Sequence, residues 1–193
     1  PLYAILFLIF LYGPVLLLPL FSFNDATYAV FPLKGLTLKA YQQMIHDPSL
    51  IAALKNSLMV AVGVSIVSTA FGLLAAMGVT RYKMPGQGPV MGGIMLPLVV
   101  PSIILSVALL VIVRQVFDIP LTLWTVGAGH VLLCVPFSMM VLMARLEGFD
   151  KSLEEASSDL GENGWMTFWR VTFPLALPGV VSSLLMSFTI SLD

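Results

Sequence analysis

The sequence has few charged residues and a single cysteine. Asp, Glu, Lys and Arg make up 10% of its 193 residues, 59% are hydrophobic, and the mean hydropathy is +1.00. Because Cys134 has no cysteine partner in the chain, a disulfide framework and a cysteine metal cluster are both excluded. A water-soluble domain does not need this much apolar surface to fill one core. The composition therefore predicts a protein that folds in a lipid bilayer.

Long apolar segments recur along the chain. A membrane-spanning helix needs about 20 mainly apolar residues, because the hydrocarbon layer is about 30 Å thick and lipid satisfies no backbone polar group. We expect an all-α, polytopic transmembrane helix bundle that forms one domain over residues 1–193. Five segments are long enough to span: Leu2 to Phe23, Ser57 to Val79, Pro89 to Val113, Leu123 to Ala144, and Leu175 to Asp193.

The first segment is not typical of a cleaved signal peptide. It lacks a charged start, contains Pro14 and Pro19, and shows no small-residue cleavage site before Asn24, so we expect it to be retained. The chain begins at Pro1 rather than Met and stops at Asp193 inside an apolar run. We therefore expect the domain to be incomplete at its C-terminal end, with at least one further helix beyond it.

The basic residues predict which connections face the cytoplasm, where Lys and Arg are enriched. Residues 81–88 and 145–173 carry Arg81, Lys83, Arg145, Lys151 and Arg170, whereas the other connections carry Lys34, Lys39, Lys55 and Arg114. We expect residues 81–88 and 145–173 inside and the loop 24–56 outside. In that outer loop Leu38, Tyr41 and Ile45 recur at helical spacing and predict a short surface helix, with Ser49 capping the helix that follows.

Two spans carry patterns that shape a helix bundle. In the second, Ser68, Gly72 and Ala76 fall four residues apart, which allows another helix to approach closely. In the third, Pro97 and Pro101 each remove a backbone donor and bend the helix. The bend is consistent either with the wall of a translocation pathway or with a kink that only shapes the bundle.

Two ionisable residues lie within predicted spans. His130 shares a face with Cys134, and no second His or carboxylate lies three or four residues away, so we interpret it as a hydrogen-bonded packing residue. Asp193 is more informative, because an ionisable group deep in an apolar helix needs a partner or a function. Counting along the fifth span places it in the outer half of the membrane.

Acidic residues gather in one stretch, EEASSDLGENGWMTFWRVTFP, at residues 154–174. Asp150, or Ser152 in a capping box with Glu155, is suited to begin a helix there. Gly161 is placed to end that helix in a left-handed turn, and a second short helix follows from about Gly164. We expect this segment to expose the small residues Ala156, Ser157 and Ser158, which favours docking on another protein over a solvated charged loop.

The spacing of this stretch resembles the EAA loop of ABC importer permeases: Glu-Ala-Ala, three residues, Gly, nine residues, Ile-x-Leu-Pro. The matching residues are Glu155, Ala156, Ser157, Gly161, Val171, Phe173 and Pro174, with Ser, Val and Phe as departures from the pattern. Further segments, among them LPLVVPSIILSVALL, HVLLCVPF, ARLEGFDKSLEEASSDLG and FTISLD, resemble the spermidine/putrescine permease subunits over nearly the whole chain.

The resemblance implies a type I ABC importer permease fold in the bacterial inner membrane, with about six spans in the full chain and five here. It implies that residues 145–173 form a cytoplasmic coupling loop. The residues expected to contact the ATP-binding subunits are Glu154, Glu155, Ala156, Ser157, Asp159, Leu160 and Gly161. It also implies a second permease subunit and a periplasmic or lipid-anchored solute-binding protein as partners, besides membrane lipid, and no nucleic acid.

The sequence contains no GxxxxGK[ST] phosphate loop, so we expect ATP to be bound and hydrolysed by a partner. We expect this chain itself to be no enzyme and to hold no cofactor or metal. The resemblance favours polyamines as the solute, and Asp193 supplies a charge that suits a small polycation. Three alternatives stay open: the same importer for ferric iron, phosphonate, sulfate or thiamine; a structural Asp193 paired with a base of the partner permease; and a membrane scaffold that transports nothing.

Overall fold

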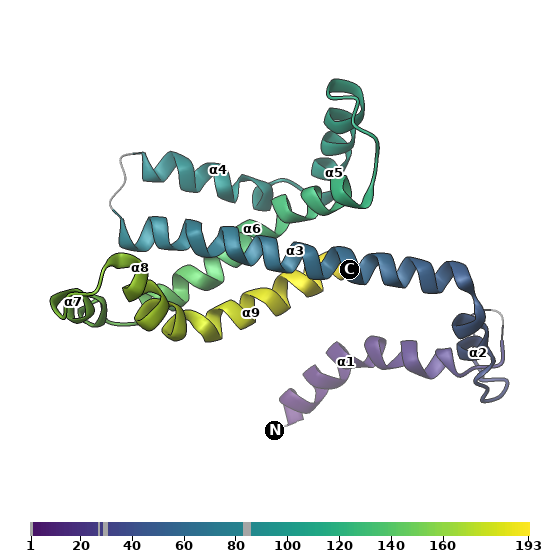
Figure 1. Cartoon of the computed structure of the whole chain (residues 1–193). Coiled ribbons are helices and arrows are strands. Elements are labelled where there is room, and N and C mark those ends of the chain that lie inside the picture. The colour runs from purple at the N-terminus through teal and green to yellow at the C-terminus, as the bar shows by residue number, and fades with distance from the viewer. Residues whose placement is uncertain (1, 27, 29–30, 83–85) are drawn as a thin grey trace. The chain divides into compact units, whose positions relative to one another are not determined.

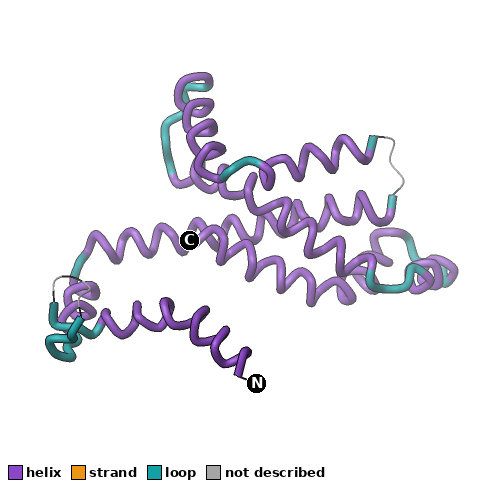
Figure 2. The backbone as a smooth tube through the Cα atoms, turned by 180° about the vertical axis from the view of Figure 1, so that it is seen from behind, coloured by secondary structure: helices purple, strands orange, loops and turns teal. Residues whose placement is uncertain are grey.

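The computed structural model describes residues 2–26, 28, 31–82 and 86–193, and helices account for most of them (Figures 1 and 2). The elements are α1 (Leu2–Ser22), α2 (Lys39–His46), α3 (Pro48–Arg81), α4 (Gln87–Val99), α5 (Ser102–Val111), η1 (Ile112–Val116), α6 (Leu123–Glu147), α7 (Ser152–Asp159), α8 (Gly164–Thr167), η2 (Phe168–Thr172) and α9 (Phe173–Leu192). Among the described residues, four helices are long and apolar enough to cross a membrane, and α4 with the α5–η1 helix makes a fifth span if the two count as one. The predicted all-α transmembrane class is confirmed.

The chain divides into two compact units, Pro1–Lys55 and Asn56–Asp193, and each is described by itself. In the first unit the predicted surface helix is present as α2. Its Tyr41 hydroxyl lies 2.6 Å from Ser22 Oγ, and the Tyr41 ring packs 5.3 Å from that of Phe23. These contacts attach α2 to the end of α1.

The predicted helix leading into the second span is present, and α3 begins at Pro48, one residue before the expected cap Ser49. Proline is tolerated in the first turn of a helix. The cap of α3 is Asp47 rather than Ser49: Asp47 Oδ1 accepts hydrogen bonds from the backbone nitrogen of Ser49 at 2.8 Å and from its hydroxyl at 2.7 Å. These bonds hold the pKa of the Asp47 carboxyl below its ordinary value.

The second unit is organised around α3, α6 and α9 (Figure 1). Its buried apolar core draws on all three helices and consists of Leu73, Ala76, Met139, Leu142, Leu146 and Ala176. The small residues predicted to permit close approach, Ser68, Gly72 and Ala76, are all buried. The predicted packing stripe on α3 is therefore confirmed.

Hydroxyl groups line the buried face of α9 at four-residue intervals. Each is paired with a neighbouring helix: Ser183 with Thr69 of α3 at 3.1 Å, Ser187 with Ser138 of α6 at 2.8 Å, and Ser191 with Nδ1 of His130 at 2.9 Å. Such pairs satisfy polar side chains where lipid offers no hydrogen bond. The interpretation of His130 as a hydrogen-bonded packing residue is confirmed.

The third predicted span is broken rather than bent. The axes of α4 and of the α5–η1 helix differ by 104° across the break. The residue before a proline is disfavoured in helical conformation, and Val100 before Pro101 is extended, with φ −86° and ψ 130°. Pro101 therefore ends α4, whereas Pro97 is accommodated inside it.

Candidate functional site

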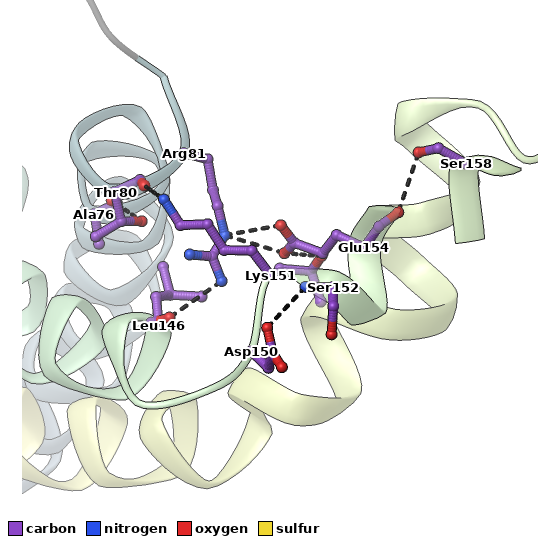
Figure 3. Close-up of polar contacts among 10 residues, drawn as sticks. Ala76, Thr80, Arg81, Leu146, Asp150, Lys151, Ser152, Glu154 and Ser158 are labelled. Carbon is purple, nitrogen blue, oxygen red and sulfur yellow. Dashed lines mark hydrogen bonds and ion pairs between the residues drawn. The ribbon is translucent and has the colours of Figure 1, made fainter. Parts of the chain in front are cut away.

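The acidic stretch forms α7, and its beginning differs in detail from the predicted capping box. Ser152 is the first residue of the helix, so its own backbone nitrogen needs an acceptor. Asp150 Oδ1 provides one at 3.0 Å (Figure 3). The box of Ser152 with Glu155 is therefore wrong. Lys151 occupies the N-cap position, and Asp150, the alternative, supplies the side-chain acceptor for the first turn from the residue before it. The hydrogen bond from the Ser152 backbone nitrogen holds the pKa of the Asp150 carboxyl below its ordinary value.

Gly161 ends α7 as predicted, with a φ of +90° that favours glycine. The backbone nitrogen of Gly161 donates to the Ser158 carbonyl at 2.9 Å, and that of Glu162 donates to the Ser157 carbonyl at 3.2 Å. These two bonds form a Schellman motif, which satisfies the last carbonyls of a helix and reverses the chain.

The predicted second short helix, α8, begins at Gly164 as expected. Its cap is Asn163, whose Oδ1 accepts from the Met166 backbone nitrogen at 2.9 Å. The helix does not stop before the membrane span, because the π-helical turn η2 joins it to α9 as one apolar helix over Gly164–Leu192. Pro174 is the second residue of α9 and follows directly after the π-helical turn η2.

The predicted coupling residues divide into an inward and an outward group. Ser157 is buried, and its hydroxyl lies 3.1 Å from that of Thr167 across the turn, so its expected exposure is wrong. Glu154 is only partly exposed and faces the helix bundle. The outward group is Glu155, Ala156, Asp159, Leu160 and Gly161.

Apolar side chains are exposed on α7 and on the helix that follows it. Leu153 and Ala156 lie three residues apart on one face of α7, and Leu160 is 86% exposed at its end. Trp165 on α8 is 68% exposed. Exposed apolar groups that lie close together and among charged residues are typical of a protein-docking surface.

Arg81, at the C-terminal end of α3, joins this segment to the bundle (Figure 3). Its Nε lies 2.9 Å from Glu154 Oε2, and its Nη2 donates to the Leu146 carbonyl at 3.1 Å. The guanidinium carbon lies 4.7 Å from the centroid of the Phe149 ring. From the sequence, Arg81 indicates only that its connection faces the cytoplasm, because no local pattern connects positions 81 and 154.

A cavity of about 450 Å³ lies between the end of α3, α7 and the α8–η2 helix. Charged and aromatic side chains line it, among them Arg81, Tyr82, Lys151, Glu155 and Asp159. A second cavity of about 460 Å³, between α3 and α6, has an apolar lining that includes Val64 and Trp124. Within the described ranges, no three His, Cys, Asp or Glu side chains lie together in a way that would hold a metal ion.

Asp193 lies far from α7 and the turn that follows it. It follows the last residue of α9, its side chain is exposed, and its backbone nitrogen donates to the Thr189 carbonyl at 3.2 Å. Because α9 has 20 residues, the two ends of this helix are about 30 Å apart. The two parts of the predicted site are therefore separate: a docking segment at one end of α9 and a carboxylate at the other.

The chain combines a broken third span, a core built from α3, α6 and α9, and the two short helices α7 and α8 between α6 and η2. It belongs to the family described as binding-protein-dependent transport system inner membrane component, whose model matches residues 68–193. The chain is therefore a multi-pass inner-membrane protein with the role of a transport permease, as the resemblance implied.

Similar proteins cover nearly the whole chain. The spermidine/putrescine transport system permease protein PotC of Haemophilus influenzae is 35% identical over 184 residues, which is 95% of this chain and 71% of that protein. The PotC protein of Escherichia coli K12 is 32% identical over 95% of this chain and 69% of its own length. The putrescine transport system permease protein PotI of the same strain is 31% identical, covering 95% and 67%.

A solved structure has the same fold. It is the crystal structure of a bacterial ABC transporter involved in the import of the acidic polysaccharide alginate, with a TM-score of 0.71 and 18% identity. The match covers 96% of this chain and 71% of that one. The predicted type I importer permease fold is thereby confirmed.

Proposed function

We propose that this protein forms the translocation path of an ABC importer for polyamines, spermidine or putrescine. The observation that carries the proposal is 35% identity over 95% of the chain to a spermidine/putrescine permease. Identity spread over the whole chain supports a common solute class more strongly than a match confined to the coupling segment, which importers of different solutes share.

ATP-binding subunits drive this permease through α7 and the turn that follows it. Five outward residues supply the contact: Glu155, Ala156, Asp159, Leu160 and Gly161. Small and apolar groups allow the helix to enter a groove on the partner, while the two carboxylates are available for basic side chains there. Ser157 and Glu154 support the contact from behind, because their side chains face the bundle.

The other components follow from the same proposal. ATP is bound and hydrolysed on the partner subunits, so this chain needs no cofactor; its sequence holds no GxxxxGK[ST] loop. A second permease subunit completes the path through the membrane, and a periplasmic or lipid-anchored binding protein delivers the solute. Residues 81–88 and 145–173 lie on the cytoplasmic side.

Asp193 provides the charge that a polycation needs along this path. A cationic solute that leaves water for a low-dielectric pathway is stabilised by a carboxylate within a few ångströms. The position of Asp193 at the C-terminal end of α9, in the outer half of the predicted span, supports this role.

Uptake in cells tests the proposed solute. Cells lacking their own polyamine importers would receive the subunit with its partners, and uptake of labelled putrescine and spermidine would be compared with that of sulfate and thiamine. We expect polyamine uptake that unlabelled polyamine suppresses and sulfate does not. An assembled, ATP-hydrolysing complex that takes up another solute and no polyamine would remove the polyamine assignment and leave the importer class intact.

A further inference from the structure

We propose that Arg81 is the positioning residue that fixes the coupling helix α7 to the end of α3, so that movement of α7 reaches the membrane spans. The proposal rests on the proposed coupling role of α7 and adds the connection behind it. A helix that docks on an ATPase transmits motion only if it is attached to the spans more firmly than by its flanking turns.

Arg81 reaches three parts of the chain through one planar group. Its Nε lies 3.1 Å from Oε1 and 2.9 Å from Oε2 of Glu154 on α7, so both oxygens of the Glu154 carboxylate face the guanidinium. Its Nη2 donates to the carbonyl of Leu146, near the end of α6, at 3.1 Å. Its face lies over the Phe149 ring in the α6–α7 turn. A guanidinium makes such contacts in a fixed geometry, which the flexible single charge of Lys does not.

Glu154 extends the connection to the last span. Its Oε1 also accepts a hydrogen bond from the Thr172 hydroxyl at 2.7 Å, and Thr172 is the residue directly before α9. One carboxylate on α7 therefore contacts both the end of α3 and the start of α9. Displacement of α7 acts on two spans of the core at the same point.

Lys151, directly before α7, strengthens the same junction. Its Nζ donates to the carbonyl of Thr80 at 3.1 Å (Figure 3). The last carbonyls of a helix carry partial negative charge, so a Lys there is favourable. The α6–α7 turn and α7 thus hold the final turn of α3 through two independent contacts.

Burial separates this ion pair from an ordinary surface pair. The side chains of Arg81 and Glu154 are 9% and 19% exposed, whereas those of Arg170 and Glu162, which pair within the same segment, are 62% and 27% exposed. Solvent screens an exposed pair, so its loss changes little, whereas a largely buried charge that loses its partner is left uncompensated. The Arg170–Glu162 pair is therefore a matched control with the same chemistry.

The test uses the complete transporter in proteoliposomes with its ATP-binding subunits, second permease and solute-binding protein. The measured quantity is labelled putrescine taken up per ATP hydrolysed, with copurification of the ATP-binding subunits as a measure of assembly. The variants are Arg81→Gln, Glu154→Gln, Arg81→Lys and the charge reversal Arg81→Glu with Glu154→Arg; the controls are Arg170→Gln and Glu162→Gln.

We expect Arg81→Gln and Glu154→Gln to assemble and to lower the uptake per ATP by about tenfold, the range of an ordinary coupling free energy. Arg81→Lys and the charge reversal should recover part of the loss, and the two controls should change the ratio less than about twofold. A ratio in Arg81→Gln equal to that of the wild type would overturn the proposal and leave the proposed function standing.

Two other results are also decisive. If every variant at Arg81, including Lys, loses assembly to the same extent, the residue is only structural and the proposal fails. If the wild-type complex hydrolyses ATP and takes up no polyamine, the proposed function fails first, and that result is recognised before any variant is compared.

Discussion

Gly72 of α3 lies directly against Ser138 of α6. A Cβ atom at position 72 would lie 2.5 Å from the Cβ of Ser138 and 2.9 Å from the backbone nitrogen of Met139. Real Cβ atoms do not approach other heavy atoms so closely. The obstructing atoms are the Cβ of Ser138 and backbone atoms of Ser138 and Met139, which cannot move aside as the end of a flexible side chain can. The absence of a side chain at Gly72 therefore sets the distance between α3 and α6.

The first prediction concerns this contact. Gly72→Ala should destabilise the folded subunit by about 1–3 kcal/mol, because overpacking a close helix contact forces the backbones apart. Gly63→Ala on the same helix is the control, because a Cβ there has no neighbour within 4 Å. Unfolding of the purified complexes in detergent measures the difference, and equal midpoints for the two variants would refute the close contact.

The second prediction concerns the turn after α7. Gly161→Val should abolish ATP-driven uptake, because a β-branched residue is strained at a φ of +90° and the turn that orients α7 relaxes. No atom of this chain lies within 4 Å of a Cβ at this position, so within the subunit the effect comes from backbone conformation. Gly161→Asn should retain more uptake than Val, since Asn tolerates this conformation. Transport at the wild-type rate in an assembled Gly161→Val complex would contradict coupling through this turn.

The third prediction concerns the docking surface. Leu160→Asp should reduce association with the ATP-binding subunits by about tenfold or more, because a charge replaces an apolar contact at an interface. The stability of the isolated subunit should not change, since the Leu160 side chain is 86% exposed. Leu36→Asp, at an exposed leucine of the loop before α2, is the control. Copurification measures both variants, and equal recovery of the ATP-binding subunits would exclude Leu160 from the contact.

The fourth prediction concerns the far end of α9. Asp193→Asn should remove polyamine uptake while assembly with the ATP-binding subunits and basal ATP hydrolysis persist, because the amide keeps the shape of the side chain and loses its charge. Uptake in cells and copurification measure the two properties. An Asn variant that no longer assembles would instead support an ion pair between Asp193 and the partner permease.

Much of the fold could be predicted because its signals are local. Apolar runs predicted the spans, the spacing of Ser68, Gly72 and Ala76 predicted a close helix contact, and Gly161 predicted a left-handed turn; all three are present. Each depends on residues within one helix or turn, where backbone preference and side-chain size decide the outcome.

The errors arose where distant residues meet. The sequence shows that Ser157 is small and near a turn, but not that the turn brings Thr167 against it. Likewise Arg81 and Glu154 are 73 positions apart, and only the packing of α3 against the α6–α7 corner makes them partners. Pro101 was expected to bend a helix, and the extended Val100 before it converts the bend into a break of 104°.

The most direct test of the account measures ATP hydrolysis and putrescine accumulation together in proteoliposomes that contain the wild-type transporter and its solute-binding protein. We predict that labelled putrescine accumulates against its gradient only when ATP and the binding protein are both present, and that Gly161→Val removes accumulation. A complex that assembles and hydrolyses ATP without accumulating putrescine or spermidine would contradict the polyamine assignment. Accumulation that persists in an assembled Gly161→Val complex would contradict coupling through α7.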